Sequence, residues 1–357
     1  MSLLEVDDLH VTFATPDGAL SAVRGLSFAV EQGETLGIVG ESGSGKSVST
    51  QTIVGLTQGA KVSGSARFEG KELLGMSDAD LRRIRGAEIG MIFQDPLSSL
   101  HPHYRVGWQI MEMIRAHERV SKKQARQRAI ELLGLVGIPM PDKRVHDYPH
   151  QFSGGMRQRA MIAMALALNP KLLIADEPTT ALDVTVQAQI MTLIKRLQHE
   201  FGTAVIMITH DLGVIADMAD RVVVMYAGKP CEFADKRTLY HQPHHPYTEG
   251  LIGSLPQRGR RGTTLKSIPG LPPSLLRVPP GCPFHPRCSY AMDLCRVEQP
   301  GIVEVAGGLD HRSACWLPPD AVGTAPDVVM RRHRAARAHG HDERIPVAST
   351  HDESAST

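Results

Sequence analysis

The chain has 357 residues, 42% of them hydrophobic, which predicts about two globular domains with ordinary cores. It carries 39 lysines and arginines against 38 aspartates and glutamates, so no net charge directs it toward nucleic acid or an anionic surface. No apolar run approaches the roughly 20 residues that a membrane-spanning helix needs. The acidic segment 1–8 lacks the pattern of a signal peptide, so we expect a cytosolic protein. Because the charges balance, we expect it to bind no nucleic acid.

Residues 2–34 alternate apolar and polar side chains around the turn 15–18, and this pattern predicts an antiparallel β region. Phe13 lies in this region, upstream of a glycine-rich loop at 40–47. The sequence leaves two interpretations of its ring equally open. The ring stacks on an adenine base, or it faces the core as an ordinary strand residue.

The glycine-rich loop at 40–47 reads Gly-Glu-Ser-Gly-Ser-Gly-Lys-Ser and fits the phosphate-loop pattern at every fixed position. An apolar strand over 35–39 precedes it and a helix over 48–56 follows, which is the context that this motif requires. Such a loop directs several backbone N–H groups and a helix N-terminus at one anion. We expect Lys46 to reach the β- and γ-phosphates of a nucleotide and the Ser47 hydroxyl to bind Mg²⁺.

A further apolar strand is expected over 88–94, and Asp95-Pro96 then breaks the regular structure. From there to about residue 162 the pattern is largely helical, with a capping-box signature at 121–124. We therefore predict a helical subdomain, residues of about 95–165, inserted into an α/β fold.

Three apolar segments, 171–177, 203–210 and 221–226, have the composition of buried strands. They alternate with helices, one of which begins after Asp183. Strands that alternate with helices predict a mostly parallel sheet covered on both faces, so the fold class expected for residues 1–236 is α/β.

Polar side chains stand at the ends of these expected strands, namely Gln94, Asp176, Glu177 and His210. Ligands bind at the carboxyl ends of parallel strands, so we expect these side chains to surround the phosphate loop. Asp176 suits Mg²⁺ coordination, and Glu177 can act as general base on a water in line with the γ-phosphate. Gln94 can orient that water or sense the metal, and His210 can contact the γ-phosphate.

Residues 152–156, Phe-Ser-Gly-Gly-Met, form a second anion-binding turn at a helix start. One chain rarely needs two such turns for one nucleotide. A dimer uses both if the turn of one subunit closes over ATP held by the phosphate loop of the other.

In this order the motifs resemble those of the ATP-binding-cassette (ABC) ATPases, over roughly residues 3–235. The resemblance makes 152–156 the signature, Ala181-Leu182-Asp183 the D-loop and His210 the switch histidine. It implies a P-loop NTPase fold with a RecA-like core, an antiparallel β subdomain and an inserted helical subdomain. It also implies a head-to-tail dimer that closes on ATP and opens on hydrolysis. Met156 replaces the usual glutamine, which loses an amide but keeps Ser153 and Gly155.

The resemblance implies a set of site residues. Glu177, His210 and Gln94 carry hydrolysis, and Ser47, Gln94 and Asp176 hold Mg²⁺. The residues expected to contact ATP, in this chain or in its partner, are Phe13, Gly40, Ser42, Gly43, Ser44, Gly45, Lys46, Ser47, Val48, Gln94, Asp176, Ser153, Gly154, Gly155 and Asp183.

Residues 244–248, 268–273 and 281–288 look like the C-terminal extension of oligopeptide and dipeptide importer ATPases. Such importers pair two different ATPase subunits beneath two membrane permeases, at the cytoplasmic face of the membrane, and an extracytoplasmic binding protein delivers the substrate. The resemblance places the permease contact beside Gln94, at 95–104. Nickel and glutathione importers share the extension, so another small solute is an alternative to peptides.

The second unit expected in this sequence, 237–318, contains Cys282, Cys288, Cys295 and Cys315. In a reducing compartment, such clustering argues for a metal site rather than disulfides. Four thiolates suit a [4Fe–4S] cluster or tetrahedral zinc, but the closely spaced cysteine pairs of most structural zinc sites are missing. The resemblance also favours the cluster; zinc and unmetallated thiols are the alternatives.

Residues 319–357 contain little that could be buried and are expected to be disordered. Two other functions fit the sequence less well. A chromosome-maintenance ATPase would carry long coiled coils between the phosphate loop and the signature, and none is seen. A redox-responsive cassette that no longer hydrolyses ATP is disfavoured by Glu177 and His210.

Overall fold

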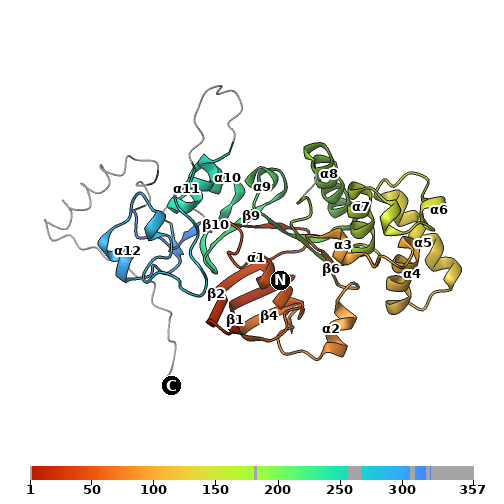
Figure 1. Ribbon diagram of the computed structural model, residues 1–357, viewed down its shortest axis with the longest axis horizontal. Helices are drawn as coiled ribbons and strands as arrows, with labels where there is room; N and C mark the ends of the chain where they lie inside the picture. The colour runs from red at the N-terminus through yellow and green to blue at the C-terminus, as the bar shows by residue number, and fades with distance from the viewer. Residues whose placement is uncertain (1, 181–182, 256–266, 306–309, 319–321, 323–357) are drawn as a thin grey trace, which may run out of the picture.

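The computed structural model describes residues 2–180, 183–255, 267–305, 310–318 and 322. Figure 1 shows four parts of the structure. A central sheet lies in the middle, a small antiparallel sheet lies below it, a helical lobe lies beyond β6, and the C-terminal unit lies beyond β10.

The central sheet has eight strands in the order β11-β12-β10-β9-β3-β8-β7-β6. Neighbours among β9, β3, β8, β7 and β6 are parallel, whereas β10, β12 and β11 run antiparallel at one edge. Every residue of β3, β7 and β8 is buried, as continuous apolar runs predict for strands covered on both faces. The strands are β3 (Thr35–Val39), β6 (Ile89–Ile92), β7 (Leu172–Asp176), β8 (Ala204–Thr209), β9 (Arg221–Tyr226), β10 (Lys229–Asp235), β11 (Val303–Glu304) and β12 (Arg312–Ser313).

The second sheet is antiparallel, in the order β2-β1-β4-β5. The region expected over 2–34 supplies two of its strands, and residues 60–72 add the other two. Its apolar face packs with strands of the central sheet in one core, with α1 (Lys46–Ile53) between the sheets. The strands are β1 (Leu4–Thr15), β2 (Gly18–Val30), β4 (Ala60–Phe68) and β5 (Lys71–Glu72), and α2 (Asp78–Ile84) follows.

The helical lobe begins where the sequence predicts a break after Gln94. Its capping box forms as expected: the Ser121 hydroxyl accepts from the Gln124 N–H at 3.2 Å, and the Gln124 side chain accepts from the Ser121 N–H at 2.9 Å. The helix expected to start at the 152–156 turn begins at Gly154, and the Ser153 side chain caps it. The helices are α3 (Pro96–Ser99), α4 (Val106–His117), α5 (Lys122–Leu135), α6 (Pro141–Arg144), the 3₁₀ helix η1 (Pro149–Gln151) and α7 (Gly154–Ala165).

The remaining helices cover the sheet or belong to the C-terminal unit. The unit adds β11 and β12 to the edge of the cassette's own sheet, and its small cluster of Tyr290, Met292 and Leu317 is its own core. The helices are α8 (Val184–Phe201), α9 (Leu212–Met218), α10 (Lys236–His241), α11 (Pro246–Gly253), the 3₁₀ helix η2 (His285–Arg287) and α12 (Asp293–Val297).

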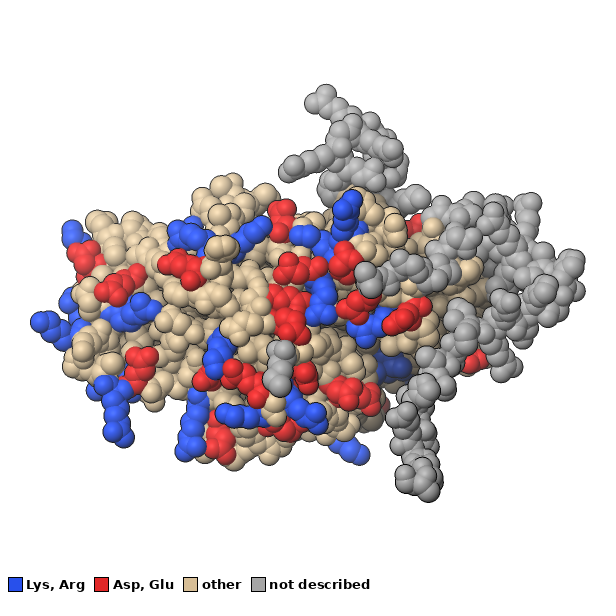
Figure 2. Space-filling view, turned by 180° about the vertical axis from the view of Figure 1, so that it is seen from behind, with Lys and Arg blue, Asp and Glu red and all other residues tan. Residues whose placement is uncertain are grey.

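The surface agrees with the balanced composition, because Figure 2 shows acidic and basic side chains interspersed over the face it displays. Within the described ranges, no helix is both long enough and apolar enough to cross a membrane.

Candidate nucleotide site

The loop at 40–47 joins β3 to α1 and lies close against the backbone of its neighbours. A Cβ atom on Gly45, whose φ is +97°, would lie 2.3 Å from the Ala22 carbonyl oxygen. A Cβ on Gly40 would lie 2.2 Å from the carbonyl oxygen of Met225. Glycine is therefore required at both positions, and the loop is fixed in a tight turn at the N-terminus of α1.

Lys46 follows this turn and is only 5% exposed. Its Nζ donates to the carbonyl oxygens of Gly40 at 2.7 Å and Glu41 at 2.9 Å. Burial lowers the pKa of the ammonium group. The buried Ser44 hydroxyl finds no hydrogen-bond partner among the described residues. The loop thus has a buried cation and an unsatisfied hydroxyl at the place where a phosphate would bind.

Ser47 and Asp176 bring two oxygen ligands together from α1 and the end of β7. The Ser47 hydroxyl donates to Asp176 Oδ1 at 2.7 Å. Asp176 is 2% exposed, and burial raises the pKa of its carboxyl group. A hydroxyl and a carboxylate beside a phosphate loop are the protein ligands that Mg²⁺ prefers, so these residues fit the ion.

Glu177 lies at the centre of a second cluster, just beyond β7. Its Oε2 accepts from Gln94 Nε2 at 3.2 Å, and its Oε1 lies 3.4 Å from His210 Nδ1. The structure therefore brings together three side chains that the sequence places after β6, β7 and β8. Glu177 has a φ of +46°, a left-handed conformation that is unusual for a residue with a side chain and that often marks functional sites.

Two further polar residues hold this cluster, and sequence reasoning missed both. The Thr180 hydroxyl donates to Glu177 Oε2 at 2.7 Å. The buried Gln158 side chain donates to the Pro178 carbonyl oxygen at 2.5 Å, which links α7 to the turn after Glu177. The only feature of the sequence that could have indicated Thr180 is its position three residues after Glu177. The only such feature for Gln158 is its place in the helix that follows the signature.

The Ser-Gly-Gly turn does not cover the phosphate loop of its own chain. Ser153 and Gly154 are exposed, and the Ser153 hydroxyl accepts from the Met156 N–H at 3.3 Å as the cap of α7. Figure 1 shows α7 in the helical lobe, well separated from α1. The third member, Gly155, lies in the first turn of α7, where a Cβ would approach Val186 at 3.0 Å.

Three other expected contact residues lie on separate elements. Phe13 is half-buried on β1, paired with Leu20 of β2, and packs against the core of the two sheets. Val48 is half-buried on α1. The Asp183 side chain caps α8 by accepting from the Val186 N–H at 3.0 Å. The rest of the expected D-loop, Ala181-Leu182, lies outside the described residues.

The four cysteines of the C-terminal unit are free thiols, and Cys288, Cys295 and Cys315 pack against the same small apolar cluster. Burial raises the pKa of Cys288 to about 12, and Cys282 and Cys295 contribute in the same direction. Burial also raises the pKa of Cys315 and Cys282. Across the described part of the chain, however, no group of three or more His, Cys, Asp or Glu side chains is arranged to hold a metal ion. The expected cluster-binding domain is therefore not supported by the geometry.

Comparison with known proteins places these features in a family. A family model for "ABC transporter" matches residues 23–180, and one for "Oligopeptide/dipeptide transporter, C-terminal region" matches residues 231–295. The oligopeptide transport ATP-binding protein OppD of Bacillus subtilis is 53% identical over 350 residues, which cover 97% of this chain and 97% of that protein. The chain belongs to the family of ABC transporter ATP-binding proteins.

Other similar proteins support the same assignment to this family. The OppD protein of Salmonella typhimurium is 54% identical over 84% of this chain and 89% of its own length. The dipeptide transport ATP-binding protein DppD of Bacillus subtilis is 52% identical over 88% and 94%. A solved dimeric ATP-binding cassette in a post-hydrolysis state, bound to ADP and Pi, matches with a TM-score of 0.60 and 29% identity, over 66% of this chain and 99% of that chain. These matches confirm the predicted α/β cassette fold and make the chain an ATPase.

Proposed function

We propose that this family member is the ATP-binding and ATP-hydrolysing subunit of a membrane importer for oligopeptides or dipeptides. The observation that carries the proposal is the Glu177 carboxylate, held between Gln94 and His210 beside the Ser47–Asp176 pair. The peptide substrate is proposed because the relatives named above, identical at about half of their positions, are oligopeptide and dipeptide transport proteins.

In the proposed mechanism, the loop N–H groups and Lys46 bind the phosphates, and Ser47 with Asp176 hold Mg²⁺. Mg²⁺, when bound, neutralises charge that develops on the phosphates. Glu177 takes a proton from the attacking water as general base. Gln94 orients that water, and His210 contacts the γ-phosphate. The Thr180 hydroxyl, at 2.7 Å from Glu177, fixes which carboxylate oxygen faces the water.

We propose that two cassettes share each ATP. The exposure of Ser153 and Gly154, and the distance of α7 from α1 in Figure 1, support a turn that acts on a neighbouring chain. ATP would favour the closed pair and hydrolysis the open one, because the γ-phosphate is the group that both chains contact. The partner that we propose is a second, different ATPase subunit, as the resemblance described under Sequence analysis implies.

The remaining partners would be two membrane permeases and an extracytoplasmic binding protein that supplies them, with this chain at the cytoplasmic face of the membrane. The permease contact is proposed at 95–104, next to Gln94. Tyr104 is 46% exposed and stacks on Trp108, itself 41% exposed, with ring centroids 4.3 Å apart. A pair of exposed aromatic rings at the end of this segment suits a protein interface.

We propose a domain boundary near residue 236, between an ATPase domain (1–236) and the C-terminal unit (237–318), with the helical subdomain at about 95–165. β10 ends at Asp235 and α10 begins at Lys236, which supports this position. The expected disordered tail, 319–357, lies almost entirely outside the described residues.

A [4Fe–4S] cluster on the four cysteines remains a proposal, with zinc and free thiols as alternatives. Its support is the donor set: four thiols in one small unit, with the Cys282 N–H donating to the Cys295 carbonyl oxygen at 2.8 Å. A bound group would have to displace protons from thiols whose pKa burial raises. Protein purified without oxygen should show broad visible absorption and about four irons per chain. Colourless protein that contains zinc would contradict the cluster.

The function is tested with the complete transporter in vesicles. Vesicles that hold the permeases, both ATPase subunits and the binding protein should take up labelled peptides only with ATP. Lys46→Ala in this chain should reduce that uptake at least tenfold, because the phosphates lose their buried cation. ATP-dependent uptake of nickel or glutathione in place of peptides would contradict the peptide assignment.

A further inference from the structure

Two residues of the C-terminal unit, Arg287 and Tyr247, hydrogen-bond to Glu41 of the phosphate loop. The Arg287 guanidinium donates from Nη1 to Glu41 Oε2 at 2.6 Å and from Nη2 to Glu41 Oε1 at 2.9 Å. The Tyr247 hydroxyl, on α11, accepts from the Glu41 backbone N–H at 2.8 Å. Residues of the C-terminal unit thus hold both the side chain and the main chain of Glu41.

Arg287 is held firmly in this position. Its side chain is 5% exposed, and its Nε donates to the Pro269 carbonyl oxygen at 2.9 Å. Nη1 also lies 3.3 Å from the Tyr226 hydroxyl, and the guanidinium lies 6.0 Å from the centre of the Phe284 ring. A planar guanidinium that binds a carboxylate with two hydrogen bonds fixes the geometry of that carboxylate, which a lysine cannot do.

The position of Glu41 gives this ion pair a consequence for nucleotide binding. The Glu41 carbonyl oxygen accepts from Lys46 Nζ at 2.9 Å, so the residue lies beside the proposed phosphate site. Glu41 also lines a cavity of about 260 Å³ together with Ser42, Gly43 and Ser44. An unpaired carboxylate at this place would repel a bound triphosphate, because like charges in a partly desolvated site interact strongly.

We propose that Arg287 is a positioning residue for nucleotide binding: it neutralises and orients Glu41 and so makes the ATP affinity of the loop depend on the C-terminal unit. This inference rests on the proposed ATP-binding function of the loop at 40–47. Arg287 itself contacts no phosphate; it acts through Glu41.

The proposal is tested by the affinity of the full chain for ATP, measured by displacement of a fluorescent ATP analogue. Arg287→Gln should weaken binding at least about tenfold, because it leaves Glu41 charged and unpaired. Arg287→Lys should weaken it about threefold, since the ammonium keeps the charge but loses the two parallel bonds. The double variant Glu41→Gln with Arg287→Gln should bind within about threefold of the unaltered chain, because neither charge remains. Arg296→Glu, an exposed charge reversal in the same unit, is the matched control and should change nothing.

Restored ATP binding in the double variant would distinguish a role in positioning Glu41 from a purely structural role of Arg287. If Arg287→Gln binds ATP normally, or if the double variant is as weak as the single one, the proposal is wrong. If Arg287→Gln does not fold, Arg287→Lys and the double variant decide: unchanged binding by Arg287→Lys, or weak binding by a folded double variant, overturns it. Failure of the unaltered chain to bind ATP would instead refute the proposed function of the loop.

Discussion

The nucleotide site takes its polar side chains from the carboxyl ends of β3, β6, β7 and β8, whereas the C-terminal unit uses its polar side chains to attach itself to the sheet. The Glu177 carboxylate contacts Gln94 and His210, and the His210 side chain remains 61% exposed, so it can still contact a ligand. Where the C-terminal unit attaches, by contrast, buried Glu232 of the cassette strand β10 accepts the His245 N–H at 2.9 Å and lies 2.7 Å from His311 Nε2. Substitutions of polar side chains in the nucleotide site should therefore change ATP hydrolysis, whereas those where the C-terminal unit attaches should change the free energy of unfolding.

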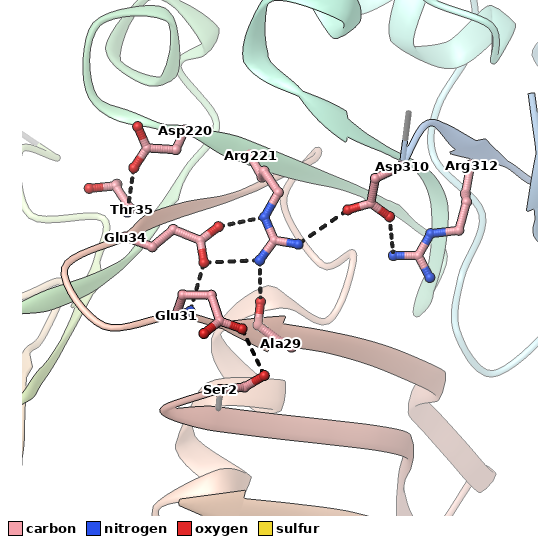
Figure 3. A network of polar contacts seen from close by, with 9 residues as sticks. All are labelled: Ser2, Ala29, Glu31, Glu34, Thr35, Asp220, Arg221, Asp310 and Arg312. Carbon is pink, nitrogen blue, oxygen red and sulfur yellow. Dashed lines mark hydrogen bonds and ion pairs between the residues drawn. The ribbon is translucent and has the colours of Figure 1, made fainter. Parts of the chain in front are cut away.

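A second connection of the C-terminal unit, shown in Figure 3, lies closer to the surface. Arg221 at the start of β9 binds Glu34 with two hydrogen bonds, of 2.5 and 2.9 Å, and donates to the Ala29 carbonyl oxygen at 2.9 Å. Its Nη1 also reaches Asp310 at 3.3 Å, and Asp310 pairs with Arg312 at 3.3 Å. Among the described residues, the unit is thus attached to the cassette by the buried hydrogen bond between Glu232 and His311 and by ion pairs that are partly exposed.

The largest effect on stability is expected at Glu232. Glu232→Ala leaves His311 and the N–H groups of His244 and His245 buried without their acceptor, which should lower the free energy of unfolding by about 3–5 kcal/mol. Urea denaturation of the full chain measures this change. The Glu298→Ala variant, at an exposed position of the C-terminal unit, should cost less than about 0.5 kcal/mol. A loss at Glu232 no larger than in this control would contradict the comparison.

Acid should also weaken the C-terminal attachment. Burial lowers the pKa of His245 to about 4, whereas an unfolded histidine titrates near 6.5. Between these values the unfolded chain binds a proton that the folded chain does not, so the free energy of unfolding falls as the pH is lowered. The loss attributable to His245 reaches up to about 3 kcal/mol near pH 4.

His245→Asn tests this prediction, because it removes the titrating ring but keeps a side-chain acceptor for the Tyr247 N–H. Urea denaturation at pH 7 and pH 5 should show a smaller decrease in stability for the variant than for the unaltered chain. An equal decrease would mean that other groups cause the acid sensitivity.

The smallest effect is expected at Asp310. Its side chain is 48% exposed, so the ion pairs with Arg221 and Arg312 are screened by solvent. Asp310→Asn should lower the free energy of unfolding by less than about 1 kcal/mol, and added salt should reduce the difference further. A loss comparable to that at Glu232 would show that the exposed connection is as important as the buried one.

The two regions also differ in how much the sequence predicts. The meeting of Gln94, Glu177 and His210 follows from buried strands whose ends must converge, since parallel order places them at one edge. The sequence also predicts a helix start at 152–156, and α7 begins there, at Gly154; it does not predict that the Ser153 side chain caps this helix, because the same hydroxyl suits anion binding. The Arg287–Glu41 pair joins residues 246 positions apart. No local periodicity links residues so far apart, and only the packing of η2 against the phosphate loop brings them together.

The central claim, that Glu177 is the base of an ATP-hydrolysing site, is tested most directly by measuring ATP binding and hydrolysis for Glu177→Gln in the assembled transporter. Gln keeps the size of the side chain and can still accept from Thr180, but it cannot take a proton. We predict unchanged ATP affinity and a steady-state hydrolysis rate reduced roughly 10²–10⁴-fold. Undiminished hydrolysis by a variant that binds ATP normally would contradict the account.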